Sequence, residues 1–142
     1  MGPDLSIRML TWIEARTDAS AIREAVFVAE QAVPPEIELD EWDERCDHAL
    51  AVDARGRAIG TGRLLPDGHI GRMAVLREHR GRGVGAAILE ALIERARQRG
   101  MRRVVLNAQT HAAGFYARFG FAVSGDEFVE AGIPHVEMAR AL

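Results

Sequence analysis

Alternating glycines mark residues 80–85, which read Arg-Gly-Arg-Gly-Val-Gly. An apolar run ends at Val75 before them, and a segment with helical periodicity follows them. Such a turn lets a ligand come close to the backbone, because glycine has no Cβ. The first N–H groups of the helix lack intrahelical partners and, with the helix dipole, favour an anion. We therefore predict a pyrophosphate cradle at residues 80–86, where Arg80 and Arg82 add positive charge.

Other interpretations of the cradle fit less well. A P-loop requires a lysine after its last glycine, and this chain contains no lysine. Gly81, Gly83 and Ala86 fit the dinucleotide pattern G-x-G-x-x-A. That fold, however, binds the ribose with an acidic residue about 20 positions further on, and here the next apolar run, 104–106, ends in Asn107. A nicotinamide-dependent enzyme and a loop that only turns a strand into a helix are the weaker alternatives.

Apolar runs and turn residues predict the elements that position the cradle. The predicted strands cover residues 7–13, 49–52, 58–65, 69–75, 102–107, 121–123 and 135–139, and the predicted helices cover residues 18–31, 84–99 and 112–119. The first helix would begin at an N-cap, Thr17, residues 125–134 would form a loop, and Gly60 and Gly62 would mark a bend. The strand 69–75, the next helix and the strand 102–107 form a βαβ crossover. That crossover places the cradle where open α/β sheets bind ligands.

The chain resembles the GNAT superfamily, the acetyl-CoA-dependent N-acyltransferases. Arg80, Gly83 and Gly85 match its cofactor signature, Gln/Arg-x-x-Gly-x-Gly/Ala. Residues 112–121, Ala-Ala-Gly-Phe-Tyr-Ala-Arg-Phe-Gly-Phe, resemble its second signature, A-x-x-F-Y-x-x-x-G-F. Segments that resemble the ElaA-like branch are Arg23 with Phe27, Glu30-Gln31 and Val33-Pro34, then Asn107-Ala108-Gln109 and Gly132-Ile133-Pro134-His135-Val136-Glu137-Met138. The likeness therefore spans nearly the whole chain.

The resemblance implies a fold and an activity. The fold is the α/β (α+β) GNAT fold, in which helices flank a mixed, mostly antiparallel central sheet that is splayed between its two central strands. One N-acetyltransferase domain would span residues 1–142. The activity is the transfer of an acetyl group from acetyl-CoA to a primary amine, on a small molecule or a peptide, by direct attack in a ternary complex. The alternative is a non-catalytic acyl-CoA-binding sensor or interaction module.

The resemblance also implies roles for single residues. The backbone of residues 73–75 would pair with the pantetheine arm and polarise the thioester carbonyl, and Tyr116 would be the general acid that protonates the thiolate. The residues expected to bind acetyl-CoA are Met73, Ala74, Val75, Arg80, Gly81, Arg82, Gly83, Val84, Gly85, Ala86, Asn107 and Phe115. The candidates for the base or the acceptor site are His111, Glu127 and His135, whereas His69 and His79 are expected to be structural.

Composition limits the class of protein. The chain has 142 residues, a net charge of −3 and a single cysteine, Cys46, which excludes a disulfide scaffold and argues against nucleic-acid binding. No apolar run has transmembrane length, and we expect a cytoplasmic protein that binds no membrane. The sequence contains neither a cysteine pair nor a His-x-x-x-His motif, so it does not predict a metal site. The acidic segment 36–47 is either a solvated loop or an entry loop that attracts a cationic amine. GNAT-like proteins are often dimers, so the resemblance makes a homodimer a possible assembly.

Overall fold

The computed structural model describes residues 5–35 and 40–142. Within these residues a seven-stranded sheet has the order β1-β2-β3-β4-β5-β7-β6. Its strands are β1 (Leu5–Leu10), β2 (Asp47–Asp53), β3 (Ala58–Leu64), β4 (His69–Val75), β5 (Arg103–Gln109), β6 (Ala122–Glu130) and β7 (Ile133–Ala141). Neighbouring strands run antiparallel, except that β4 and β5 run parallel. The predicted mixed, mostly antiparallel sheet is confirmed.

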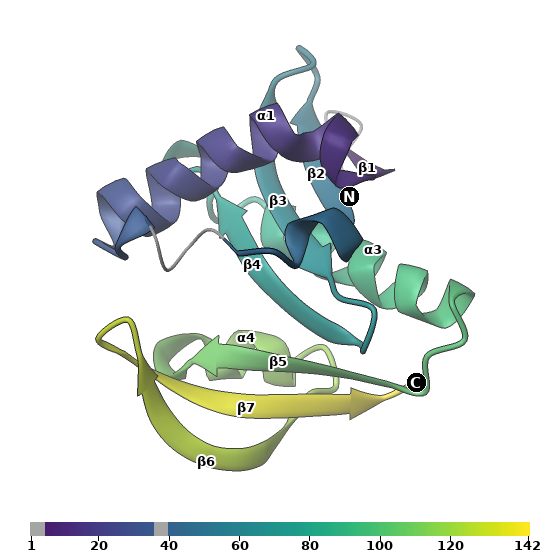
Figure 1. The fold of residues 1–142 in the computed structure, drawn as a ribbon, viewed down its shortest axis with the longest axis vertical. Coiled ribbons are helices and arrows are strands. Elements are labelled where there is room, and N and C mark those ends of the chain that lie inside the picture. The colour runs from purple at the N-terminus through teal and green to yellow at the C-terminus, as the bar shows by residue number, and fades with distance from the viewer. Residues whose placement is uncertain (1–4, 36–39) are drawn as a thin grey trace.

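The sheet divides between β4 and β5 (Figure 1). These strands pair near the start of β4, where His69 lies opposite Val105 and Ile70 opposite Leu106. The pairing of β3 with β4 contains a register shift, and within β4 Arg72 has a left-handed φ of 49°. An extra residue in one strand of a pair bends that strand, so β4 turns away from β5 beyond Ile70. The predicted splay between the two central strands is confirmed.

Helices cover both faces of the β1–β4 part of the sheet (Figure 1). On one face α1 (Trp12–Arg23) continues into a π-helix, η1 (Glu24–Glu30), and on the other lies α3 (Val84–Gln98). The short helix α4 (Ala113–Ala117) packs against β5. Short 3-10 turns are η2 (Asp43–Arg45), η3 (Arg77–His79) and η4 (Thr110–Ala112). The helix α3 connects β4 to β5, so the predicted βαβ crossover is confirmed.

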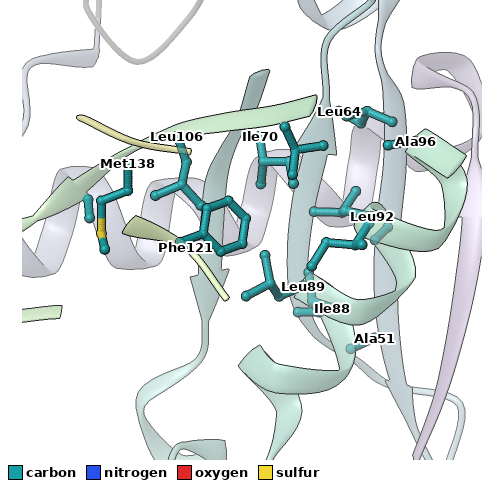
Figure 2. Close-up of a cluster of buried hydrophobic side chains, with 14 of the residues drawn as sticks. Ala51, Leu64, Ile70, Ile88, Leu89, Leu92, Ala96, Leu106, Phe121 and Met138 are labelled. Carbon is teal, nitrogen blue, oxygen red and sulfur yellow. The ribbon is translucent and has the colours of Figure 1, made fainter. Parts of the chain in front are cut away.

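The main core lies between α3 and the sheet (Figure 2). Ile88, Leu89 and Leu92 of α3 are completely buried. A Cβ built on Gly62 of β3 would lie 2.9 Å from Ile88 Cγ2 and 3.0 Å from Leu92 Cδ1. Such a contact is too close for any larger residue. Gly60 and Gly62, expected to mark a bend, therefore lie within a continuous strand and let α3 approach it closely.

The helix α1 begins earlier than predicted. Thr11 is its N-cap: the Thr11 side chain accepts a hydrogen bond from the Glu14 N–H, and the Glu14 carboxylate accepts one from the Thr11 N–H. This capping box satisfies N–H groups at the helix start. It therefore starts a helix at residues 12 and 13, although their β-propensity favours a strand. The predicted strand 7–13 is therefore confirmed for residues 7–10 and wrong beyond them, where Ile13 is 91% exposed in the first turn of α1. The predicted cap Thr17 is wrong.

Residues 125–134, predicted as a loop, are mainly strand. The strand β6 continues to Glu130, and a turn at Ala131 and Gly132, both with positive φ, connects it to β7. A turn of this kind matches the twist of hairpin strands. β6 is the edge strand of the sheet and its side chains are mostly exposed, so no apolar alternation reveals it in the sequence. The loop prediction is wrong for this reason.

Candidate active site

The predicted cradle, residues 80–86, lies at the N-terminus of α3. Gly81 and Gly83 have φ of 77° and 81°, a left-handed backbone that glycine adopts without steric cost. A Cβ built on either glycine would meet no atom of the described residues within 4 Å, so the space above the turn is open to a ligand. The first backbone bond of the helix runs from the Ala87 N–H to the Gly83 carbonyl, which leaves the N–H groups of residues 84–86 without helical acceptors. This geometry suits a phosphate.

Arg80 and Arg82 have different surroundings at the cradle. Arg80 donates from Nη1 and Nη2 to the Glu30 carboxylate at 2.6 and 2.8 Å, and from Nε to the Val75 carbonyl at 3.0 Å. The bond to Glu30 raises the pKa of Arg80, and the same bond lowers the pKa of Glu30. Arg82 is exposed. Arg80 therefore connects η1 to the end of β4, with its charge already paired, and Arg82 offers its charge to solvent.

A cleft of about 400 Å³ opens where β4 and β5 separate. Four of the predicted site residues line it: Met73, Asn107, Tyr116 and His135. Phe27 of η1 and Gln31, just after it, also line the cleft. A π-helical turn at this position is often associated with function. It replaces the second half of the regular helix predicted at residues 18–31. The cleft is therefore formed by η1, both central strands, α4 and the β6–β7 hairpin.

The helix α4 connects the cleft to the cradle. Phe115 Cζ lies 3.7 Å from a Cβ built on Gly85, in the first turn of α3. The adjacent residue, Tyr116, lines the cleft. The two rings meet edge to face, with centroids 5.1 Å apart. A ligand seated on the cradle and extended along β4 would therefore pass this pair of rings before it reached the cleft.

Tyr116 has a half-buried phenol that packs against the apolar core. Its hydroxyl donates to Met73 Sδ at 3.9 Å, a contact to a weak acceptor. Burial raises the pKa of Tyr116, because the phenolate would be poorly solvated there. The side chain therefore keeps its proton at neutral pH and holds it without a strong competing acceptor.

The candidate bases occupy different places. His135 lines the cleft, its Nδ1 lies 2.7 Å from the Ile133 carbonyl, and its ring stacks on Phe128. A carbonyl only accepts, so Nδ1 carries the hydrogen and Nε2 has the free lone pair. His111 and Glu127 are exposed and lie outside the described lining of the cleft.

Comparisons with known proteins agree with this geometry. Residues 15–142 match the model of the acetyltransferase (GNAT) domain. The chain belongs to the GNAT acetyltransferase family. The uncharacterized N-acetyltransferase YjcF of Bacillus subtilis is 42% identical over 131 residues, which cover 89% of this chain and 93% of that protein.

Two crystal structures resemble this GNAT protein along its length. A candidate N-acetyltransferase of Lactobacillus plantarum is 30% identical, with a TM-score of 0.90 over 98% of this chain and 99% of that chain. ElaA of Escherichia coli is 28% identical, with a TM-score of 0.84 over 96% of this chain and 99% of that chain. The predicted likeness to ElaA is therefore confirmed at the level of the whole fold.

Three aspartates of the acidic segment of this GNAT protein are bound to arginines. Residues 36–39, including Glu36 and Glu38, lie outside the described residues. Asp40 contacts Arg63 and Arg72, Asp43 contacts Arg23 and Arg63, and Asp47 contacts Arg95 and Arg99. These three aspartates are thus engaged within the fold, so they do not supply the field expected to attract a cationic amine.

Cys46 lies away from the chemistry of this GNAT protein. Its thiol is buried and donates to the Trp42 carbonyl at 3.1 Å. Burial raises the pKa of Cys46 to about 11, so the thiolate is scarce at neutral pH. Neither the described cleft lining nor the cradle includes this residue. These observations disfavour an acyl-enzyme on Cys46.

Sequence reasoning missed several polar side chains of the cleft: Gln31, Arg63, His69, Arg72, Gln109 and Glu130. His69, expected to be structural, begins β4 with its Nδ1 3.0 Å from the Asp67 carboxylate. Arg63 carries a signal in the sequence, since it is the one charged residue of the strand β3. Gln31 and Gln109 lie in segments that resemble the ElaA-like branch, but the resemblance assigned them no role. Among the described helices, none is long and apolar enough to cross a membrane.

Proposed function

We propose that this GNAT protein transfers an acetyl group from acetyl-CoA to a primary amine by direct attack in a ternary complex. The observation that carries the proposal is the junction of an open anion cradle with a cleft lined by Tyr116 and His135. Acetyl-CoA supplies an acetyl group activated as a thioester. The cytoplasmic location and the homodimer stay predictions.

The cradle fits the pyrophosphate of acetyl-CoA. The open turn at Gly81 and Gly83, with the outward N–H groups of residues 84–86, provides donors to phosphate oxygens. Arg82 adds charge beside them. The backbone of residues 73–75 lies along the edge of β4 that faces the splay, where it would hold the pantetheine arm. Phe115 and Asn107 would contact the same ligand from α4 and β5.

Two side chains of the cleft suit the proton transfers that amine acetylation requires. His135 has its lone pair on Nε2, because Nδ1 donates to the Ile133 carbonyl, and Nε2 would accept a proton from the amine. Tyr116 holds a proton on Oη that would pass to the departing sulfur. Neither transfer uses Cys46. The base and the acid therefore lie on separate elements, β7 and α4, that line one cleft.

The cradle is tested by calorimetric titration with acetyl-CoA and CoA. In Gly83→Glu a carboxylate would enter the cradle and repel phosphate, so binding should fall by at least 100-fold. Gly56→Glu is the matched control, because Gly56 also has a φ of 80° and no described atom within 4 Å of a built Cβ. Tight binding by the control and by the wild type, with loss in Gly83→Glu, is the expected result. Equal binding by both variants would place the ligand elsewhere.

The base is tested with His135→Gln and His111→Gln, assayed for amine acetylation across pH. Removal of a general base lowers kcat/KM by roughly 10²–10⁴-fold, and this loss should occur in His135→Gln. A loss confined to His111→Gln would move the base to the exposed histidine. A protein that binds acetyl-CoA but acetylates no amine in a broad screen would instead be the non-catalytic sensor.

A further inference from the structure

A hydrogen bond between two glutamines joins separate elements that line the cleft. Gln109 ends β5, and its Nε2 donates to Gln31 Oε1 at 3.1 Å. Gln31 directly follows η1, which packs against β4. Both side chains line the cleft, and both residues are half-buried. The bond therefore brings two amides, from residues 78 positions apart in the chain, to one place in the cleft.

Neighbouring contacts hold the two amides in place. His111 Nε2 lies 2.7 Å from Gln109 Oε1. Because an amide oxygen only accepts, His111 is the donor in this contact, and the Gln109 Nε2 is left to donate to Gln31. The Gln31 N–H donates to the Val26 carbonyl at 3.0 Å at the end of the π-helix, and the next residue, Ala32, has a left-handed φ of 59°. Left-handed backbone is costly for alanine, and strain of this kind clusters at functional sites.

The glutamine pair lies beside the proposed base. Gln109 is directly opposite His135 in the antiparallel pairing of β5 with β7. Side chains that are opposite one another in such a pair share a face of the sheet, with their Cβ atoms about 5 Å apart. An amide oxygen has two lone pairs, so Gln31 Oε1 can accept a second hydrogen bond besides the one from Gln109. One part of the cleft therefore offers two acceptors to a ligand, His135 Nε2 and Gln31 Oε1.

We infer that Gln31 orients the acceptor amine for attack and that Gln109 positions Gln31 for this task. This inference rests on the proposed acetyl transfer. A neutral primary amine has two N–H groups and one lone pair. With one N–H donated to His135 Nε2 and the other to Gln31 Oε1, the lone pair is left to attack the thioester carbon. A secondary amine has a single N–H and leaves one acceptor unpaired, so the two acceptors together select primary over secondary amines.

The bond to Gln31 grows stronger during the reaction. The amine nitrogen bonds to the thioester carbon while the C–S bond breaks, one amine proton passes to His135 Nε2, and the departing sulfur takes the proton of Tyr116. The nitrogen carries positive charge until its proton leaves, and a charged donor makes a stronger hydrogen bond than a neutral one. Gln31 therefore stabilises the transition state more than it stabilises the bound neutral amine.

The test compares two primary amines, hexylamine and 2-phenylethylamine, with their N-methyl derivatives. Their apolar bodies suit cleft-lining residues such as Phe27, Ile70 and Ile133. In the wild type, kcat/KM should be about tenfold or more higher for the primary amines, as expected for one charge-assisted hydrogen bond. Gln31→Met removes the acceptor and keeps a similar side-chain length, so this ratio should fall by roughly tenfold, whereas steric exclusion of the methyl group would persist. Gln31→Glu should keep the preference, because a carboxylate accepts both hydrogen bonds.

Two further variants separate orientation of the amine from packing. Gln109→Met should also lower the ratio, because the Gln31 amide then loses the donor that holds it. Gln98→Met is the matched control, because it replaces an exposed glutamine at the end of α3 and should leave the ratio unchanged. The ratio compares two amines on one protein, so it does not depend on the fraction of each variant that is folded and active.

A second measurement does not depend on turnover. Calorimetry with CoA present compares binding of the two primary amines, as ammonium ions, with binding of their N,N-dimethyl derivatives, which retain one N–H. The primary amines should bind more tightly to the wild type, and this difference should shrink in Gln31→Met. If the difference is observed but no amine is acetylated, the inference is supported and the proposed function alone fails.

The outcomes that contradict the inference are distinct from failure of acetyl transfer. Where amines are acetylated, equal kcat/KM values for primary and N-methyl amines, a preference that survives in Gln31→Met, or an equal fall in Gln98→Met would overturn the inference and leave amine acetylation intact. Where no amine is acetylated, equal or undetectable binding of the primary and N,N-dimethyl amines would overturn it.

Discussion

Replacement of Tyr116 by phenylalanine separates the chemistry of the phenol from its packing. The substitution removes one oxygen, whose described contact is a 3.9 Å bond to Met73 Sδ. The ring keeps its contacts with Phe115 and Phe121, at centroid distances of 5.1 and 6.1 Å. The loss of a weak hydrogen bond costs about 1 kcal/mol or less. We therefore expect the free energy of unfolding to change by no more than that.

The expected effect on catalysis is much larger. Burial raises the pKa of Tyr116 above its ordinary value of about 10, so the phenol is protonated throughout the neutral range. Loss of a general acid lowers the rate by roughly 10²–10⁴-fold, or about 3–5 kcal/mol of transition-state stabilisation. A raised pKa also means that kcat should not decline on the alkaline side until the pH exceeds about 10.

The assay measures kcat by thiol release at saturating acetyl-CoA and amine, together with the acetyl-CoA Kd and the urea unfolding transition. Phe121→Leu is the control, because it disturbs a buried contact of the Tyr116 ring but keeps the hydroxyl. Its stability should fall by about 1 kcal/mol, with kcat retained. A Tyr116→Phe enzyme whose kcat stays within about threefold of the wild type would refute the assignment of the general acid.

Two further predictions concern the aspartates beside the cleft. Asp43→Asn should lower the free energy of unfolding by about 3–5 kcal/mol in urea denaturation. The reason is that Arg23 is 1% exposed and would lose a charged partner. A loss below about 1 kcal/mol, which is typical of an exposed ion pair, would contradict this reasoning. Burial opposes ionisation of Asp40, but Arg63 and Arg72 outweigh it and hold the pKa of Asp40 below its usual value. On acidification the unfolded chain therefore protonates Asp40 at a higher pH than the folded chain does. The stabilisation that the Asp40 carboxylate contributes is present above about pH 4 and is lost as the pH falls through the lower pKa of Asp40 in the folded state. Asp40→Asn should flatten the dependence of the free energy of unfolding on pH between about pH 3 and 7. An unchanged slope would contradict the contribution assigned to Asp40.

The parts of the site that are local in sequence were predictable from it. The cradle follows from alternating glycines between an apolar run and a helical stripe, and the structure places Gly81 and Gly83 in the left-handed backbone that only glycine adopts freely. The crossover follows from the same order of elements. The capping box at Thr11 and Glu14 was also visible, as Thr-x-x-Glu. It was missed because Ile13 favours a strand when considered alone.

The parts that depend on distant contacts were not predictable. The described aspartates of the acidic segment have no local signal for their partners, which are arginines 20 to 52 residues away in the chain. The left-handed residue of the β4 bulge is Arg72 and not its neighbour Gly71, so the sequence does not mark the position, which becomes apparent only when β3 and β4 are paired. The strand β6 was not predicted in full because its side chains are mostly exposed at the edge of the sheet, so its sequence lacks an apolar alternation.

The aspartate–arginine cluster connects stability to the shape of the cleft. Arg23 belongs to α1, Arg63 to β3 and Arg72 to the bulge of β4, and Asp40 with Asp43 joins these elements. A change that weakens the cluster should therefore alter the bulge that separates β4 from β5. Asp43→Asn, assayed below its unfolding temperature, should raise the KM of the amine more than the Kd of acetyl-CoA, because the cradle at Gly81 and Gly83 lies outside the cluster. Equal changes in both constants would show that the cradle and the cleft loosen together, as one cooperative unit.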